Sequence, residues 1–403
     1  MKIYFIIFFG FIFQLVLYSC KTVGPEAEKY SYIKVPWSSI NSIEQNNDKV
    51  SLKKSVEDNL KWLNKKRPDS VLKYQDFYFY VKDYICSSKN FLNDLNNNLT
   101  IKTSLENNFN LFKVKITSEK PIIFTGYYIP YVHASLTPSD KFQVPVYKMP
   151  KDMVFVNLED FNSELKDKFI RGRIEKNRLL PYWSREEIVD DKVLHDKGLE
   201  IAWLQDKVDL FFIEIQGSGL LTFPDNSKKF IRYSGQNWRE YYPIGAALFN
   251  EGRLKKNEVS MQSIKRWLKE NPEEQSRILN TNKSFVFFNL ENDGPFGNIN
   301  VKLTPERSLA ADQKVFPAGS LMLVDFEMPK TSEQSNNQQF SQLAFVQDTG
   351  GAIRGPTRID VFWGEGDTAG NIAGVSKQEG LLYVVAPRYN CNKSLISYYG
   401  FDP

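Results

Sequence analysis

Residues 343–374 read LAFVQDTGGAIRGPTRIDVFWGEGDTAGNIAG, and seven of the 22 glycines in the chain lie within them. Glycine at this density indicates tight turns or close backbone approaches that side chains would block. Two short runs of β-forming residues, 343–347 and 358–363, flank the first glycines. Asp348 ends the first run, and Asp360 lies inside the second. Two carboxylates delivered by neighbouring strands could therefore share one site.

The second run alternates between apolar and mixed positions, which predicts a strand with two different faces. One face carries Ile359, Val361 and Trp363, and the other carries Arg358, Asp360 and Phe362. We expect the apolar set to face a core and Asp360 to face a cleft or solvent. Aspartate is disfavoured inside a strand, so a functional role is favoured for Asp360. Asp348 has a competing explanation, because aspartate beside glycine is commonly a turn former.

The triplet Asp348-Thr349-Gly350 matches the pattern of aspartic proteases. That chemistry needs two such carboxylates that share one proton. The chain has no second triplet of this kind, since residues 367–370 read Asp-Thr-Ala-Gly. A protease would therefore require a homodimer.

The chain resembles the membrane-bound lytic murein transglycosylase A family in nine motifs that follow one another in order. Three of them resemble its three-aspartate domain, with matching aspartates Asp312, Asp348 and Asp360: AADQKVFPAG (310–319), FVQDTGGAIRG (345–355) and RIDVFWG (358–364). The other six are FTGYYIP (124–130), LPYWSREEI (180–188), FFIEIQGSG (211–219), YSGQNWREYYPIGAAL (233–248), SFVFF (284–288) and KLTPERSLA (302–310). Before about residue 110 there is no motif to match.

The resemblance implies a mainly β fold with flanking helices. A double-psi β-barrel domain would be built from both parts of the chain, residues 51–130 and 251–403. A second β-barrel domain, residues 131–250, would be inserted between them. The order of local signals agrees with this organisation, because a block of short strands and turns, predicted to be all β, separates two regions that mix helix and strand.

The resemblance also implies an activity, namely cleavage of the β-1,4 bond between N-acetylmuramic acid and N-acetylglucosamine with formation of a 1,6-anhydromuramoyl end. The partners would be peptidoglycan glycan strands and, as one option, a cell-wall synthesis complex, and no cofactor is expected. Asp360 matches the catalytic aspartate, Asp348 would assist it, and Asp312 would be structural. Glycan-binding positions would be Thr125, Tyr127, Gln216, Ser218 and Gln236.

One carboxyl group can first protonate the glycosidic oxygen as an acid and then remove the proton of the C6 hydroxyl as a base. To be protonated at neutral pH, this carboxyl needs a pKa raised by burial or by a nearby like charge such as Asp348. Two alternatives remain open. An inverting hydrolase would need a second carboxylate roughly 6.5–9.5 Å away, for which Glu365 and Asp367 are candidates. A non-catalytic peptidoglycan-binding module could use the same groove.

Local patterns predict several elements. Leu52, Val56, Leu60 and Leu63 recur at helical spacing, a second helix is predicted over residues 81–109, and residues 261–268 form an amphipathic stripe. FFIEIQGSGLLTF reads as a strand-turn-strand, with Gln216 and Ser218 pointing outward on either side of Gly217. Tyr127 could stack on sugar rings or belong to the core, and Gly126 allows a close approach.

The N-terminus reads as a bacterial lipoprotein signal. Lys2 is followed by an apolar run to residue 17 and by Ser19-Cys20, which is typical of a secretory signal that ends in a lipidated cysteine. We therefore expect a signal peptide at 1–20, an acylated Cys20 that anchors the protein to the periplasmic face of the outer membrane, and a polar tether at 21–50. An ordinary secreted protein is the alternative.

Composition excludes other classes. The net charge of +4 over 403 residues gives no reason to expect a nucleic-acid partner. His133 and His195 are the two histidines, and no Cys/His cluster has metal-ligand spacing, so no metal is expected. Cys86 and Cys391 could pair in an oxidising compartment, but their spacing in the sequence leaves this open.

Overall fold

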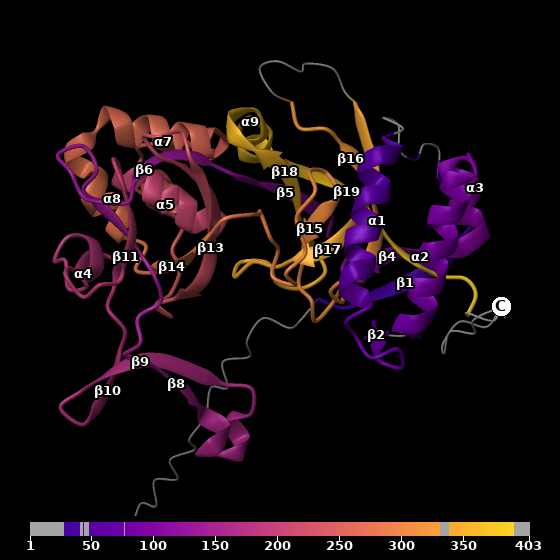
Figure 1. The fold of residues 1–403 in the computed structure, drawn as a ribbon, viewed down its shortest axis with the longest axis horizontal. Helices are drawn as coiled ribbons and strands as arrows, with labels where there is room; N and C mark the ends of the chain where they lie inside the picture. Colours follow the sequence, from indigo (N-terminus) through magenta and orange to yellow (C-terminus); the bar gives the residue numbers. More distant parts are fainter. Residues whose placement is uncertain (1–27, 41–42, 44–47, 76, 331–337, 391–403) are drawn as a thin grey trace, which may run out of the picture.

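Six strands close into a barrel in the computed structural model, which describes residues 28–40, 43, 48–75, 77–330 and 338–390 (Figure 1). The ring closes because β19 pairs with both β16 and β5. In ring order the strands are β5 (Ile122–Ile129), β18 (Arg358–Glu365), β15 (Ser308–Ala310), β17 (Gln339–Asp348), β16 (Leu321–Glu327) and β19 (Lys377–Pro387). The predicted strands at 343–347 and 358–363 are confirmed as parts of β17 and β18.

Two further strands extend the sheet outward from β19. β4 (Phe109–Ile116) pairs with β19, and β1 (Tyr30–Val35) pairs with β4. The prediction that residues 21–50 form only a tether is therefore wrong for β1. The segment YSYIKV consists mostly of β-forming residues, and Tyr32 is buried against the core.

Three helices pack beside the barrel on the side where β1 and β4 lie: α1 (Lys49–Leu63), α2 (Val81–Asn96) and α3 (Ile101–Asn108) (Figure 1). The helix predicted from Leu52 to Leu63 is confirmed. The single helix predicted over 81–109 is two helices, because Asn98 adopts a positive φ of 64° and the Thr100 side chain caps α3 through the Thr103 amide. A small hairpin precedes α2, formed by β2 (Val71–Lys73) and β3 (Tyr78–Tyr80).

A second six-stranded sheet forms the other large unit of the molecule. Its strands in order are β14 (Val286–Glu291), β13 (Lys228–Gln236), β12 (Ser218–Thr222), β6 (Tyr131–Ser135), β11 (Glu200–Leu204) and β7 (Val144–Tyr147). Since β14 hydrogen-bonds to β13, this unit extends past the predicted limit at residue 250. We propose that the inserted domain ends near residue 291.

Helices interrupt the block predicted to be all β, so that prediction is wrong in detail. The helices inside the block are α4 (Arg185–Val189), α5 (Lys207–Gln216) and α6 (Ile244–Asn250). Two more, α7 (Met261–Glu270) and α8 (Gln275–Asn280), follow after it. Short 3-10 turns occur at Trp37–Ser39, Leu158–Asp160, Ser163–Leu165, Lys256–Glu258 and Pro272–Glu274. The amphipathic stripe predicted at 261–268 is confirmed as α7.

The segment FFIEIQ is a helix and not the first strand of a hairpin. The Asp206 side chain accepts a hydrogen bond from the Val208 amide at 2.7 Å and starts α5, and Gly217 ends it in the left-handed conformation with φ of 74°. Because α5 is apolar on nearly all sides, its sequence lacks the helical period that would have revealed it. Gln216 and Ser218 therefore do not alternate on one strand.

A three-stranded arm projects from the second sheet (Figure 1). It consists of β8 (Met153–Asn157), β9 (Phe169–Glu175) and β10 (Arg178–Pro181). One face of the arm meets the body, where Phe169 and Arg171 pack on Trp238. Ile174 and Leu179 share the opposite face and are exposed.

Most buried apolar residues form two cores, one within the barrel and its helices and one within the second sheet. A smaller cluster joins them, because Leu220 and Phe230 of the second sheet pack with Tyr127, Ile129 and Phe362 of the barrel. The helix α9 (Gly366–Val375) covers β5 and β18. Gly126 permits the predicted close approach, since a Cβ there would lie 2.4 Å from Trp363 Nε1.

Candidate active site

The backbone register brings Asp348 and Asp360 to the same level of the barrel. Ala310 on β15 is the pairing partner of Asp348 on β17 and of Asp360 on β18. The two aspartates therefore stand two strand spacings apart, about 10 Å between Cα atoms. The two strands are not neighbours as predicted, because β15 lies between them, and the sharing of one site by the two carboxyls stays a prediction.

Asp360 is held by groups from two strands. The Arg358 guanidinium donates from Nε to Oδ1 at 2.9 Å and from Nη2 to Oδ2 at 3.0 Å. The Thr125 hydroxyl on β5 donates to Oδ1, and the Arg358 Nε also donates to this hydroxyl at 3.2 Å. The Asp360 side chain is 13% exposed, so its carboxylate lies at the edge of the core. Ile359 and Val361 are fully buried on the other face, as predicted.

Asp348 lies in a different electrostatic setting. Its Oδ1 accepts hydrogen bonds from the backbone amides of Asn298 at 3.0 Å and Thr349 at 2.9 Å. Burial of the carboxyl raises the pKa of Asp348 to about 6, although these two amides and the charge of Arg232 act in the opposite direction. Asp348 is therefore a turn former through the Thr349 amide and, at the same time, a carboxyl that can carry a proton near neutral pH.

The hydroxyl of Tyr127 on β5 lies close enough to both aspartates to feel their charges. Burial raises the pKa of its hydroxyl well above the ordinary value, and the negative charges of Asp348 and Asp360 add to that shift. Its ring is buried and packs against Phe362 with centroids 5.2 Å apart. The ring face is thus occupied by the core, so the option of stacking on a sugar gives way to the core alternative.

Asp312 braces the turn that carries the site. Its Oδ2 accepts from the Gly355 amide at 2.8 Å, and its Oδ1 accepts from the Lys314 amide at 3.0 Å. Its backbone carbonyl also accepts from Val315 and Phe316. These contacts favour the structural role predicted for Asp312.

The predicted glycan-binding residues of the second domain are spread over three elements. Gln216 ends α5, and its Oε1 accepts from the Tyr128 amide of β5 at 3.2 Å, so it fastens the two domains together. Ser218 begins β12 opposite Arg232, beside a small recess that also includes Phe296. Gln236 ends β13 opposite Val286. No contact among the described residues joins Gln236 to the aspartates.

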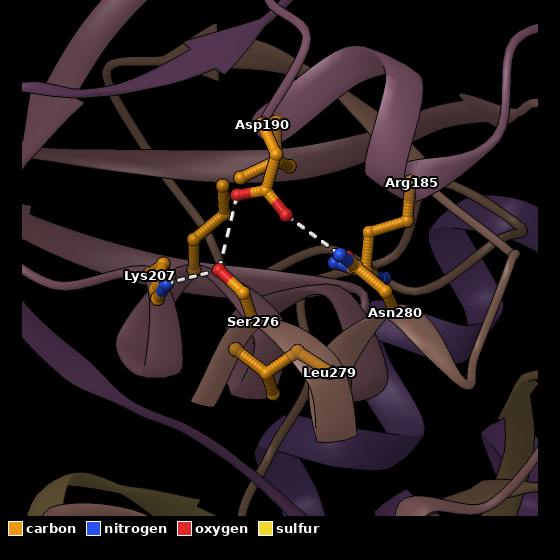
Figure 2. A pocket seen from close by; sticks show the side chains of 8 residues that line it. Arg185, Asp190, Lys207, Ser276, Leu279 and Asn280 are labelled. Atoms are coloured by element: carbon orange, nitrogen blue, oxygen red, sulfur yellow. Dashed lines mark hydrogen bonds between the residues drawn. The ribbon is translucent and has the colours of Figure 1, made fainter. Parts of the chain in front are cut away.

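A small cavity of about 10 Å³ lies elsewhere, among α4, α5 and α8 (Figure 2). Its polar groups already bind one another: Lys207 donates to Ser276, which donates to Asp190, and Asn280 donates to Asp190. The volume is enough for about one water molecule. None of the predicted site residues lines it, so it is not the candidate active site.

Glu365 is the last residue of β18, and Asp367 lies in the first turn of α9. Five strand positions separate Asp360 from Glu365, which corresponds to roughly 16 Å between Cα atoms. Glu365 Oε2 accepts a hydrogen bond from the Tyr131 hydroxyl at 3.1 Å. By these distances between Cα atoms, Asp348 is nearer to Asp360 than Glu365 is. No group of metal-ligating side chains is found among the described residues.

Two arginines and one amide in the site were not singled out from the sequence. Arg358 could have been found, because it lies two positions before Asp360 and therefore shares its face of the strand. Arg232 and Asn298 come from distant parts of the chain and carry no local signal. Cys20 lies outside the described residues, as does Cys391. Cys86 is disulfide-bonded.

The chain matches two described domain families. Residues 123–289 match the MltA specific insert domain, and residues 307–386 match the 3D domain. Over these two regions the chain is similar to the membrane-bound lytic murein transglycosylase A family. The first match covers most of β5 and the second sheet into β14, and the second match covers all three aspartates. The predicted fold class, mainly β with a closed barrel and flanking helices, is confirmed.

Relatives within this family share sequence and fold with the chain. Membrane-bound lytic murein transglycosylase A of Escherichia coli (strain K12) is 33% identical over 265 residues, which are 65% of this chain and 65% of that protein. The matched region thus spans less than two thirds of that relative. The crystal structure of a membrane-bound lytic murein transglycosylase from Agrobacterium tumefaciens has a TM-score of 0.74 at 27% identity, covering 89% of this chain and 98% of that one. MltA from Neisseria gonorrhoeae in a monoclinic form has a TM-score of 0.72 at 26% identity, with coverages of 93% and 94%.

Proposed function

We propose that this protein is a lytic transglycosylase of peptidoglycan, which cleaves the β-1,4 bond between N-acetylmuramic acid and N-acetylglucosamine and leaves a 1,6-anhydromuramoyl end. The observation that carries this proposal is the common pairing of Asp348 and Asp360 with Ala310, which sets the two residues at one level of the barrel on either side of β15. The names of the matched relatives support the reaction class. A structure of the Escherichia coli MltA, 24% identical in sequence, has the same fold and was obtained with bound chitohexaose.

In the proposed reaction, Asp360 donates a proton to the glycosidic oxygen as the bond to C1 breaks. As a carboxylate it then removes the proton from the C6 hydroxyl, whose oxygen attacks C1, so no water is added. The guanidinium of Arg358 donates hydrogen bonds to both carboxyl oxygens of Asp360, and bound substrate must displace that contact before the first step. Thr125 orients the carboxylate through its hydroxyl.

The first prediction is that Asp360→Asn abolishes cleavage of purified peptidoglycan while leaving the fold and chitohexaose binding in place. The amide is nearly isosteric with the carboxylate but cannot donate and then recover a proton. General acid–base catalysis contributes about 10²–10⁴-fold in rate, so turnover should fall by at least that factor. Mass spectrometry of the wild-type digest should show products lighter by one water than hydrolysis products.

The matched control is Asp325→Asn. Asp325 is also an aspartate on a barrel strand, but its Oδ1 accepts from Gln339 away from the site, so activity should be kept. Substantial activity in Asp360→Asn would exclude the single-carboxyl mechanism. Reducing ends in the wild-type products would assign the protein to the hydrolases, with Asp348 as the base to test. Binding of chitohexaose without any cleavage of peptidoglycan would favour the non-catalytic module.

We also propose that the mature protein begins at an acylated Cys20 and is held at the periplasmic face of the outer membrane. The Ser19-Cys20 pair after an apolar run supports this. Within the part of the chain that the structure describes, no helix is long and apolar enough to cross a membrane.

The second prediction is that Cys20→Ala leaves the protein soluble or unprocessed. A wild type recovered wholly in the soluble periplasmic fraction would contradict lipidation.

A further inference from the structure

A hydrogen-bonded path leads from the second domain to the catalytic barrel. It begins at Arg232 on β13, whose Nη2 donates to the Gly297 carbonyl at 2.8 Å and whose Nη1 donates to Asn300 Oδ1 at 2.8 Å. Gly297 and Asn300 close a turn, because the Asn300 amide donates to the Gly297 carbonyl at 3.0 Å. The guanidinium therefore holds both ends of the turn at 297–300.

The same turn contacts Asp348 directly. The Asn298 amide inside it donates to Asp348 Oδ1 at 3.0 Å. The Asn298 and Gln313 side chains bind each other, and Gln313 Nε2 lies 3.4 Å from the Asp348 carbonyl. A Cβ on Gly297 would lie 2.2 Å from the Gln347 carbonyl oxygen, so the turn rests on the end of β17 with no room for a side chain.

Arg232 also acts on Asp348 through its charge. Its positive charge lowers the pKa of the buried carboxyl, against the larger effect of burial. The other titratable group facing this carboxyl is the Tyr127 hydroxyl from β5, and Asp360 stands across β15. Arg232 is thus the cation that the second domain contributes to this carboxyl.

We propose that Arg232 is a positioning residue for the reaction, which orients the carboxyl of Asp348 through the turn at 297–300 and thereby makes the site depend on the placement of the second domain. The role of Arg232 in the reaction rests on the proposed function. The effect of Arg232 on the carboxyl of Asp348 does not, because it is a property of the folded protein. The register supports it, because Arg232 is paired with Ser218 in the middle of the sheet and its Cα position is fixed by β12 and β14.

The direct test is a pH titration of the Asp348 carboxyl by carbon-13 nuclear magnetic resonance in the full-length protein, with the signal assigned by its loss in Asp348→Asn. In Arg232→Gln the opposing charge is removed and the Asn298 amide is less firmly held. Both changes disfavour the ionised carboxyl, so the titration midpoint should rise from about 6 by roughly 1 unit. A merely structural role predicts the opposite sign, because a loosened and hydrated carboxyl would return toward its ordinary range.

Three matched variants separate charge from geometry. Arg232→Lys keeps the charge but cannot hold both ends of the turn, so its midpoint should rise less. Asn300→Gly removes one anchor of the guanidinium and tolerates the positive φ of 58° at that position, so it should give a small rise without loss of the fold. Lys302→Ala removes a cation from the same segment, where Lys302 binds Asp293, and should not shift the midpoint.

Activity provides the second readout. If Arg232 positions Asp348 for the chemical step, Arg232→Gln should lower kcat more than it raises KM, and Arg232→Lys should recover part of the loss. A midpoint that stays at the wild-type value or falls in Arg232→Gln would overturn the inference. Because the titration requires no turnover, failure of the proposed function would appear separately, as an absence of anhydro products from the wild type.

Discussion

At the scale of the single residue, the two site carboxyls owe their different behaviour to different neighbours. The Asp360 carboxyl accepts two hydrogen bonds from the Arg358 guanidinium. The Asp348 carboxyl, at the end of β17, accepts hydrogen bonds from two backbone amides instead. Burial raises the pKa of the Asp348 carboxyl to about 6, which places a carboxyl that can hold a proton near neutral pH at the same level of the barrel as Asp360.

The third prediction concerns the stability of Asp348→Asn as a function of pH. The folded protein raises the pKa of Asp348 from 3.8 to about 6, so between these values the folded state binds the proton more tightly than the unfolded chain. The wild type therefore loses stability as the pH rises from about 4 to about 6, by an amount on the order of 3 kcal/mol at one pKa unit per 1.36 kcal/mol. The amide does not titrate. The free energy of unfolding of the variant, measured in urea, should therefore rise relative to that of the wild type over this pH window. A difference between the two proteins that stays constant with pH would contradict the raised pKa of Asp348.

At the scale of the element, the close contact of β5, β18 and α9 depends on Gly126. A Cβ at this position would lie 2.4 Å from Trp363 Nε1 and 3.0 Å from the Cα of Ala373. The indole and the helix backbone would both have to move. Strand β5 carries Thr125 and Tyr127 on either side of this glycine, so the displacement would also reach the site.

The fourth prediction is that Gly126→Ala destabilises the protein by about 1–3 kcal/mol, which is the usual cost of forcing an extra group into a packed core. Gly351→Ala is the control, because a Cβ there meets nothing within 4 Å. It should be neutral or slightly stabilising. Thermal unfolding of both variants measures the difference. Equal melting temperatures would mean that β5 and α9 can separate without cost.

The sequence predicted those elements whose residues alternate or recur with a clear period. β18 was predictable because its faces differ, and α1 because Leu52, Val56 and Leu60 repeat at helical spacing. α5 was not, since an apolar helix buried on most sides presents β-forming residues without a helical period, although Asp206 and Gly217 mark its ends. The register was also beyond the sequence. Only the folded barrel pairs Asp348 and Asp360 with the same residue of β15.

At the scale of the whole molecule, a small apolar cluster connects the two domains directly beneath the candidate site. Leu220 on β12 packs in this cluster with Ile129, Phe362 and Ala310. Ala310 is the residue that pairs with both aspartates. The placement of the second domain is therefore transmitted to the site by packing here, in addition to the polar path through Arg232.

The fifth prediction compares Leu220→Ala with Leu221→Ala. The two leucines are neighbours on β12 and both are buried, but Leu221 points into the core of the second sheet. Each truncation should cost about 2–5 kcal/mol of stability, because each leaves a cavity in a packed core. Only Leu220 belongs to the cluster that contains Ala310, so only Leu220→Ala should reduce the rate of peptidoglycan cleavage per folded molecule. Calorimetry and rates normalised to the folded fraction test this together. Equal losses of activity in the two variants would mean that the second domain affects the site only through overall stability. Unchanged activity in both would contradict a role for this packing and leave the hydrogen-bonded path through Arg232 as the connection between domain and site to test.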